Sequence, residues 1–192
     1  AAFWYGLSLP RKNGRQGNPY YRNPAVGRRA LVAAATDMMM YDRDMDKGKK
    51  CNNHYIGGAM NAWLYAYEQC GEVLDKATRA AFEAGLARSL DRIERWGLQD
   101  VCTNMCMRSV AAAARLGALS EDPAIQQQAI RAVRLLLFGH ADGSIKKCDS
   151  NRGAFYLAGY VGENDGPEAT YNGVSHYHIL EARAATMGDP RW

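Results

Sequence analysis

The sequence predicts an all-α fold of stacked antiparallel helical hairpins, forming either an (α/α) toroid or an incomplete toroid that is an arc. Apolar residues recur at three- and four-residue spacing along most of the chain, which is the period of an amphipathic helix. The two-residue alternation that marks strands is nearly absent. Amphipathic segments also alternate with more apolar ones across short turns, as expected if each hairpin has one inner and one outer helix.

Proline, glycine and short polar side chains divide this pattern into helices. Asn23-Pro24 begins the first helix, and Gly71 ends the second. Asp75 caps the third, and the run 120–123 begins the fifth. The predicted helices cover residues 24–43, 53–70, 75–96, 100–116, 123–138 and 168–187.

The helices differ in polarity. Helix 75–96 alternates apolar residues with Arg and Glu and is expected to face outward, whereas helix 100–116 is small, apolar and low in charge and is expected to be buried. Trp63, Trp96 and the methionines 38–40 are interpreted as core residues.

Two parts are expected along the chain, an irregular N-terminal segment at 1–23 and an α-hairpin domain at 24–192. About three hairpins are too few to close a ring, so this domain is predicted to be an arc or part of a larger toroid.

The chain is basic, with a net charge of +4 and a pI near 8.8. Lys and Arg concentrate at 11–29 and 47–50, either as a solvated surface or as an attraction for a polyanion. No nucleic-acid-binding motif is present, and no apolar run approaches the roughly 20 residues needed to span a bilayer. The expected partner is therefore acidic, with no nucleic acid and no membrane.

Cysteine and histidine spacing does not predict a metal site. The five cysteines are an odd number, unlike a disulfide-rich scaffold, and Cys102 and Cys106 are interpreted as small buried hydrophobes. His176 and His178 are two residues apart on a predicted helix, so they point in nearly opposite directions and cannot share one ion. No organic cofactor motif is present.

Polar residues collect where the more apolar helices begin. In a hairpin stack these entrances line one rim, where unpaired helix N–H groups suit an anionic ligand. Capping alone explains single Asn, Asp or Thr residues, but it does not require the run Asn53-His54-Tyr55. The expected rim comprises Asn53, His54, Asn104, Arg152 and Tyr171. The residues expected to bind the ligand are Asn104, Arg108, Tyr156, Asn172 and His176, the last sharing a helix face with Asn172.

Two strings resemble alginate-lyase-like (α/α) toroid polysaccharide lyases. NNHYIGGAMNAW is similar to the Asn-Asn-His entrance of an inner helix in that group. DGSIKKCDSNRGAFYLAGY, at 142–160, is similar to its Asp-Gly-Ser/Thr loop, which is followed by an Arg and an aromatic-rich helix. Together the two motifs cover roughly 30 residues, and the alternating helices extend the likeness in outline.

The resemblance implies cleavage of a uronic-acid-containing polysaccharide by β-elimination. A group must neutralise the carboxylate, a base must remove the C5 proton, and an acid must protonate the departing O4. By position the resemblance implies Asn53 and His54 at the carboxylate, with Arg152 activating a tyrosine. The family's tyrosine would fall at Gly159, so the candidates are Tyr156, Tyr160 and Tyr171.

Two other functions fit the same sequence. A glycoside hydrolase on an (α/α) barrel needs two carboxylates across a cleft, and Glu163, Asp165 and Glu168 crowd a single segment. A non-catalytic helical scaffold or glycan-binding module fits the short length. A polysaccharide substrate implies a secreted or periplasmic location, although the first residues lack the arrangement of a signal peptide.

Overall fold

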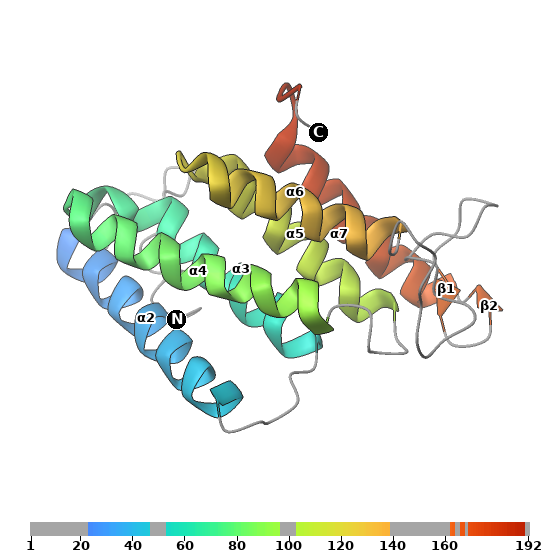
Figure 1. Cartoon of the computed structure of the whole chain (residues 1–192), viewed down its shortest axis with the longest axis horizontal. Coiled ribbons are helices and arrows are strands. Elements are labelled where there is room, and N and C mark those ends of the chain that lie inside the picture. The colour runs from blue at the N-terminus through green and yellow to red at the C-terminus, as the bar shows by residue number, and fades with distance from the viewer. Residues whose placement is uncertain are drawn as a thin grey trace, which may run out of the picture. The chain divides into compact units, whose positions relative to one another are not determined.

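The computed structural model describes residues 23–46, 53–96, 103–138, 162–163, 166–167 and 169–190 (Figure 1). Side chains are described at 23–43, 57–94, 107–138 and 173–190. The helices are α2 (Pro24–Asp46), α3 (Asn53–Cys70), α4 (Lys76–Trp96), α5 (Thr103–Leu119), α6 (Pro123–Phe138) and α7 (Ala169–Thr186). A 3₁₀ turn, η1 (Gly71–Val73), follows α3, and β1 (Gly162–Glu163) pairs antiparallel with β2 (Gly166–Pro167). The predicted all-α class is confirmed for the described part of the chain.

Short polar side chains cap the helices where the sequence predicts that they begin. The Ala25 amide donates to Asn23 Oδ1 at 3.0 Å, and the Ala124 amide donates to Asp122 Oδ1 at 2.8 Å. Asp75 accepts from the Thr78 amide at 2.9 Å, and this hydrogen bond is the main cause that lowers the pKa of the Asp75 carboxyl.

The end of α3 differs in detail from the expectation. Gly71 follows the last residue of the helix as predicted, but it begins η1 and does not adopt a left-handed conformation. A Cβ at Gly71 would be 3.3 Å from the ring of Tyr67, so close packing on that ring favours glycine there. Among described residues the left-handed glycine is Gly188, with a φ of 86°, just after α7.

The chain divides into two compact units. The first comprises residues 1–50 and 62–86, and the second comprises 51–61 and 87–192. Helices α3 and α4 each contribute to both units, so the boundaries at 61–62 and 86–87 lie inside helices. None of the helices in the described ranges is both long enough and apolar enough to cross a membrane.

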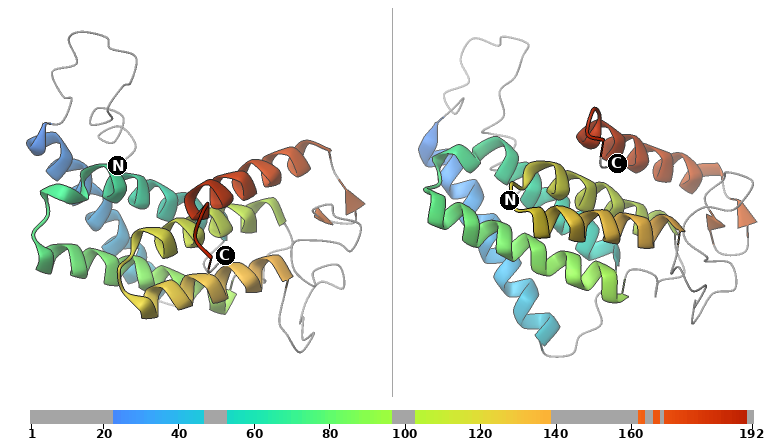
Figure 2. Two further views of the ribbon diagram at one scale, coloured as in Figure 1. Left: turned by 90° about the horizontal axis from the view of Figure 1, so that it is seen from above. Right: turned by 45° about the horizontal axis from the view of Figure 1, so that its top comes forward.

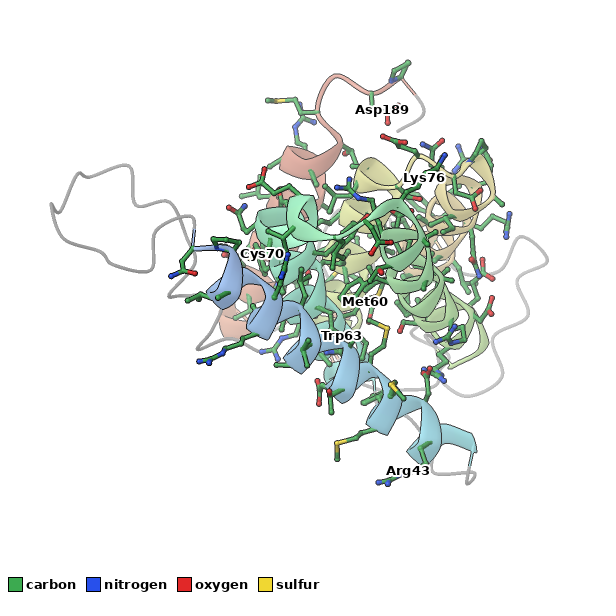
Figure 3. All side chains as sticks on the ribbon, turned by 90° about the vertical axis from the view of Figure 1, so that its left-hand side faces the viewer. Arg43, Met60, Trp63, Cys70, Lys76 and Asp189 are labelled. Carbon is green, nitrogen blue, oxygen red and sulfur yellow. The ribbon has the colours of Figure 1, made fainter. Side chains whose placement is uncertain are left out.

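The core of the first unit forms between α2 and the second half of α3. Trp63 is fully buried, and its indole N–H donates to Asp37 Oδ2 at 2.8 Å. Tyr41 meets the Trp63 ring edge-on at 5.8 Å between centroids. The buried Cys70 lies against the beginning of α2 (Figure 3). A Cβ on Gly27 would be 3.4 Å from Cys70 Cβ. Trp63 is therefore a core residue, as predicted.

The predicted apolar stripes of the first unit are mostly confirmed. The stripe on α2, from Ala30 to Met38, is buried, but Met39 and Met40 are 70% and 52% exposed, so the core interpretation of these two methionines was wrong. Neighbouring positions on a helix are separated by about 100°, so a run of three methionines cannot all face one core.

Helix α5 is the centre of the second unit. Its alanines at 111–114 are all buried, which requires neighbours on every side. Helices α6 and α7 pack on α5. In Figures 1 and 2, α7 runs in the same direction as α5, and α6 runs in the opposite direction. The prediction of a buried fourth helix is confirmed from Met107 to Leu116, except at two arginines.

Helices α4 and α6 of this unit lie side by side. Asp91 of α4 accepts a hydrogen bond from Gln128 of α6, and one turn later Glu94 pairs with Arg131 at 3.4 Å. Both residue numbers rise together, so α4 and α6 run in the same direction. In the second unit α4 and α6 thus run in one direction, and α5 and α7 run in the other.

The first turns of α3 cross α5 at Gly57. A Cβ built on this buried glycine would lie 2.6 Å from the backbone nitrogen of Ser109 and 2.8 Å from Arg108 Cβ. Asn61 Nδ2 donates to the carbonyl oxygens of Gly57 and Arg108, both at 2.9 Å. The backbones of α3 and α5 therefore meet without a side chain between them. The side-chain amide of Asn61 links them through its two hydrogen bonds.

Gly57→Ala is expected to destabilise the protein by about 1–3 kcal/mol, because the added methyl meets backbone atoms that cannot move aside independently. Gly58→Ala is the matched control. Its Cβ would be 3.8 Å from Arg108 Nη1, an ordinary contact, and alanine favours helix by about 1 kcal/mol over glycine. Urea unfolding of both variants measures the difference, and equal stabilities would contradict the close crossing.

Candidate functional site

The structure places the predicted site residues in three groups. Some lie outside the described residues, and some lie in the first turns of helices, where only the backbone is described; two have described side chains. Outside the described residues are Arg152, Tyr156 and Tyr160; in first turns are Asn53 and His54 of α3, Asn104 of α5, and Tyr171 and Asn172 of α7; Arg108 and His176 have described side chains.

The beginnings of three helices lie at one end of the second unit. The crossing at Gly57 and Arg108 comes four residues after the start of α3 and five after the start of α5. At 1.5 Å per residue, each start is about 6–8 Å along its helix axis from the crossing. Strand β1 contacts both α5 and α7, and Figure 1 shows α5 and α7 beginning at this same end. The backbones that carry Asn53, Asn104 and Tyr171 are therefore brought toward one end.

Arg108 is the predicted residue that the structure positions best. Its side chain is half-buried, and Nη1 lies 3.8 Å from the Cβ position of Gly58. Gly58 comes four residues after His54, so the two share a face of α3. The Arg108 guanidinium makes no hydrogen bond or ion pair with any residue that the structure describes. It is thus a cation beside the helix face that carries His54.

Arg115 continues the same face of α5. Seven residues separate it from Arg108, which is two helical turns and about 10.5 Å along the axis. Both arginines are half-buried, while the residues between them are buried and uncharged. The face therefore carries two positive charges on an otherwise uncharged helix. Such a row suits a ligand with repeated negative charges.

Three side chains of α7 gather near Arg115. His178 Nδ1 lies 2.9 Å from Glu181 Oε2, and Tyr177 also hydrogen-bonds Glu181. The negative charge of Glu181 is the main cause that raises the pKa of Tyr177, and Arg115 acts in the opposite direction. Tyr177 is therefore a neutral phenol at neutral pH, and it is not suited to remove a proton from a ligand.

The Tyr177–Glu181 pair was missed by the sequence interpretation. The pair could have been predicted from the sequence, because a Tyr and a Glu four residues apart on a predicted helix are neighbours on its surface. The role of Arg115 was not visible, because α5 and α7 are about sixty residues apart in the chain and only their packing brings the charge to the phenol.

His176 and His178 occupy different environments. His176, predicted from the sequence to bind the ligand, is exposed, while the side chain of His178 is 13% exposed and contacts Glu181. The side chains within the described ranges form no cluster of three or more His, Cys, Asp or Glu that could hold a metal ion. Cys51, Cys102 and Cys148 lie outside the described residues.

Glu181→Gln is expected to lower the pKa of Tyr177, because the carboxylate that disfavours the phenolate is removed while Arg115 remains. Arg115→Gln is expected to raise it further. Carbon-13 NMR titration of labelled tyrosine follows the phenol directly. Glu94→Gln, which removes a carboxylate of α4 that pairs with Arg131, is the control and should leave the Tyr177 titration unchanged. An unchanged titration in Glu181→Gln would contradict the assigned cause.

The functional assignment rests on the residues of this chain, because the comparisons with known proteins found no similar protein. No protein-family model, no curated protein and no solved structure matches the chain.

Proposed function

We propose that the chain is a carbon–oxygen lyase that cleaves a uronic-acid-containing polysaccharide by β-elimination. Its helices would belong to an (α/α) toroid or to an arc of one. The observation that supports this proposal is the charged face of α5, where Arg108 and Arg115 stand two turns apart and Arg108 lies beside the face of α3 that carries His54. A polyuronate carries a carboxylate on each acidic sugar, so it matches a row of cations.

The helix arrangement supports the toroid part of the proposal. In the second unit α5 and α7 run in one direction, and α4 and α6 run in the other. Repeating inner and outer helices in this way produces an arc whose inner helices all begin at one end. The polar entrances predicted from the sequence belong to those inner helices.

The chemistry divides among the candidate residues. Asn53 and His54 would hold the carboxylate at the reacting sugar, with Arg108 adding a positive charge that stabilises the enolate-like transition state. The base would be a tyrosine, either Tyr156 or Tyr160, which follow Arg152 in the sequence, or Tyr171, which lies in the first turn of α7. Tyr177, which keeps its proton at neutral pH, would be the residue that donates a proton to the departing O4.

The central experiment incubates the protein with alginate, glucuronan and glycosaminoglycans and follows ultraviolet absorbance together with new reducing ends. β-Elimination leaves an unsaturated uronate, so the proposal expects both signals to rise together. New reducing ends without the ultraviolet absorbance would show that the protein is a hydrolase and not a lyase. Neither signal, together with retention on an immobilised polyuronate, would leave a non-catalytic glycan-binding module.

Arg108→Ala is expected to lower kcat/KM on the responsive polysaccharide on the order of 100-fold, the loss typical of a group that stabilises transition-state charge. His54→Ala is expected to lose at least as much, with the helical circular dichroism unchanged. Arg131→Ala is the matched control, because it removes an equal charge from an exposed side chain that pairs with Glu94 on α4. Equal activity of Arg108→Ala and Arg131→Ala would remove Arg108 from the site.

A further inference from the structure

A second feature of the second unit is an open apolar groove between α6 and α7. Its volume is about 600 Å³, and its floor is formed by Val110 and Ala114 of α5. Because α5 is the central helix, the groove lies above the best-packed part of the unit. It contains none of the residues assigned to the polysaccharide site.

The two walls of the groove have the same residue spacing. The α6 wall is formed by residues 130, 133, 134, 137 and 138, and the α7 wall by residues 179, 182, 183, 186 and 187. Both sets follow positions i, i+3, i+4, i+7 and i+8, which is one face of a helix. The eight-residue span of each wall is about 12 Å long. Two helical walls over a third helix form a channel of the shape that accepts another helix.

The apolar lining of the groove includes exposed side chains at its margins. Phe138 is 67% exposed and Met187 is 79% exposed, and these two side chains are the last members of the two wall patterns. The inner lining residues Ala114, Ile130 and Ala182 are buried or nearly so. Covering the groove would remove the marginal side chains from water, which favours an apolar stripe as the occupant.

Charge defines the occupant further. Arg134 and Arg183 stand at equivalent positions of the two walls, and both are exposed. One acidic residue, Asp189, lines the end of the groove just after α7. Neither guanidinium makes a hydrogen bond or ion pair with any residue in the described part of the chain. Two cations on opposite sides of an apolar channel match a helix with acidic residues on both flanks of its apolar stripe.

The other side of α6 already shows the same kind of contact. There, α4 presents Asp91 and Glu94 to Gln128 and Arg131 of α6. A helix bound in the groove would make the same kind of contact on the opposite side of α6, with its acidic residues facing Arg134. From the paired helical stripes and the two arginines, we propose that the α6–α7 groove binds an acidic amphipathic helix of a partner segment.

A labelled synthetic peptide tests the proposal. The probe is about 18 residues long, long enough to populate a helix, with leucines at i, i+3, i+4 and i+7 and glutamates on both flanks. One control peptide has the same composition in scrambled order, and another has lysine in place of each glutamate. Fluorescence anisotropy measures the affinity, and methyl NMR of Ile130 and Ile179 reports whether the groove is occupied.

The acidic peptide is expected to bind and to shift both isoleucine methyls, while the scrambled peptide does neither. The double variant Arg134→Glu with Arg183→Glu should weaken the acidic peptide about 10-fold or more and should bind the lysine peptide better. Both positions are exposed, so the variant retains its fold. Arg28→Glu with Lys76→Glu, an equal charge change at exposed positions of the first unit, should bind the acidic peptide as the unchanged protein does.

Three results would overturn the proposal. The scrambled peptide could bind as well as the acidic one, or the charge reversal could leave both affinities unchanged. Alternatively, the isoleucine methyls could shift with protein concentration alone, in step with a dimer seen by sedimentation, which would assign the groove to a second copy.

Discussion

The contact between α3 and α5 at Gly57 determines the geometry of the candidate site. A helix crossing without side chains at its centre brings the backbones closer than ordinary packing allows, and here even one Cβ would come within 2.6 Å of a backbone nitrogen. The two hydrogen bonds from Asn61 hold this crossing from both helices. Since the crossing is about one turn from each helix start, the same contact that holds the helices together also places their polar beginnings near each other.

The distribution of burial follows from this central position of α5. A helix with neighbours on every side must use small or apolar residues, and α5 uses four consecutive buried alanines. Charged residues are tolerated on such a helix only where a face remains partly open. Arg108 and Arg115 mark that face, because both are half-buried while the other residues from Met107 to Leu116 are buried. Their half-buried positions therefore indicate where a ligand could reach α5.

The two proposed surfaces of the second unit differ in chemistry. The Arg108–Arg115 face combines cations with the hydrogen-bonded group of Tyr177, His178 and Glu181, which suits a polar, anionic polymer. The α6–α7 groove is apolar at its floor and carries its two arginines on the walls, which suits an amphipathic helix. One surface can orient proton donors and acceptors, and the other can bury apolar area.

The sequence by itself determined the helices. Hydrophobic period, caps and breakers are local properties, so the helix starting at Asn53 and the capping by Asp75 could be predicted within a few residues. Which side chains meet was decided by tertiary structure. The glycine at 57 gave no sign of its partner, and Arg115 could not be linked to Tyr177, because both relations join segments about fifty or sixty residues apart. A helical period shows which face of a helix is apolar, but the neighbour of that face depends on packing, which sequence spacing does not encode.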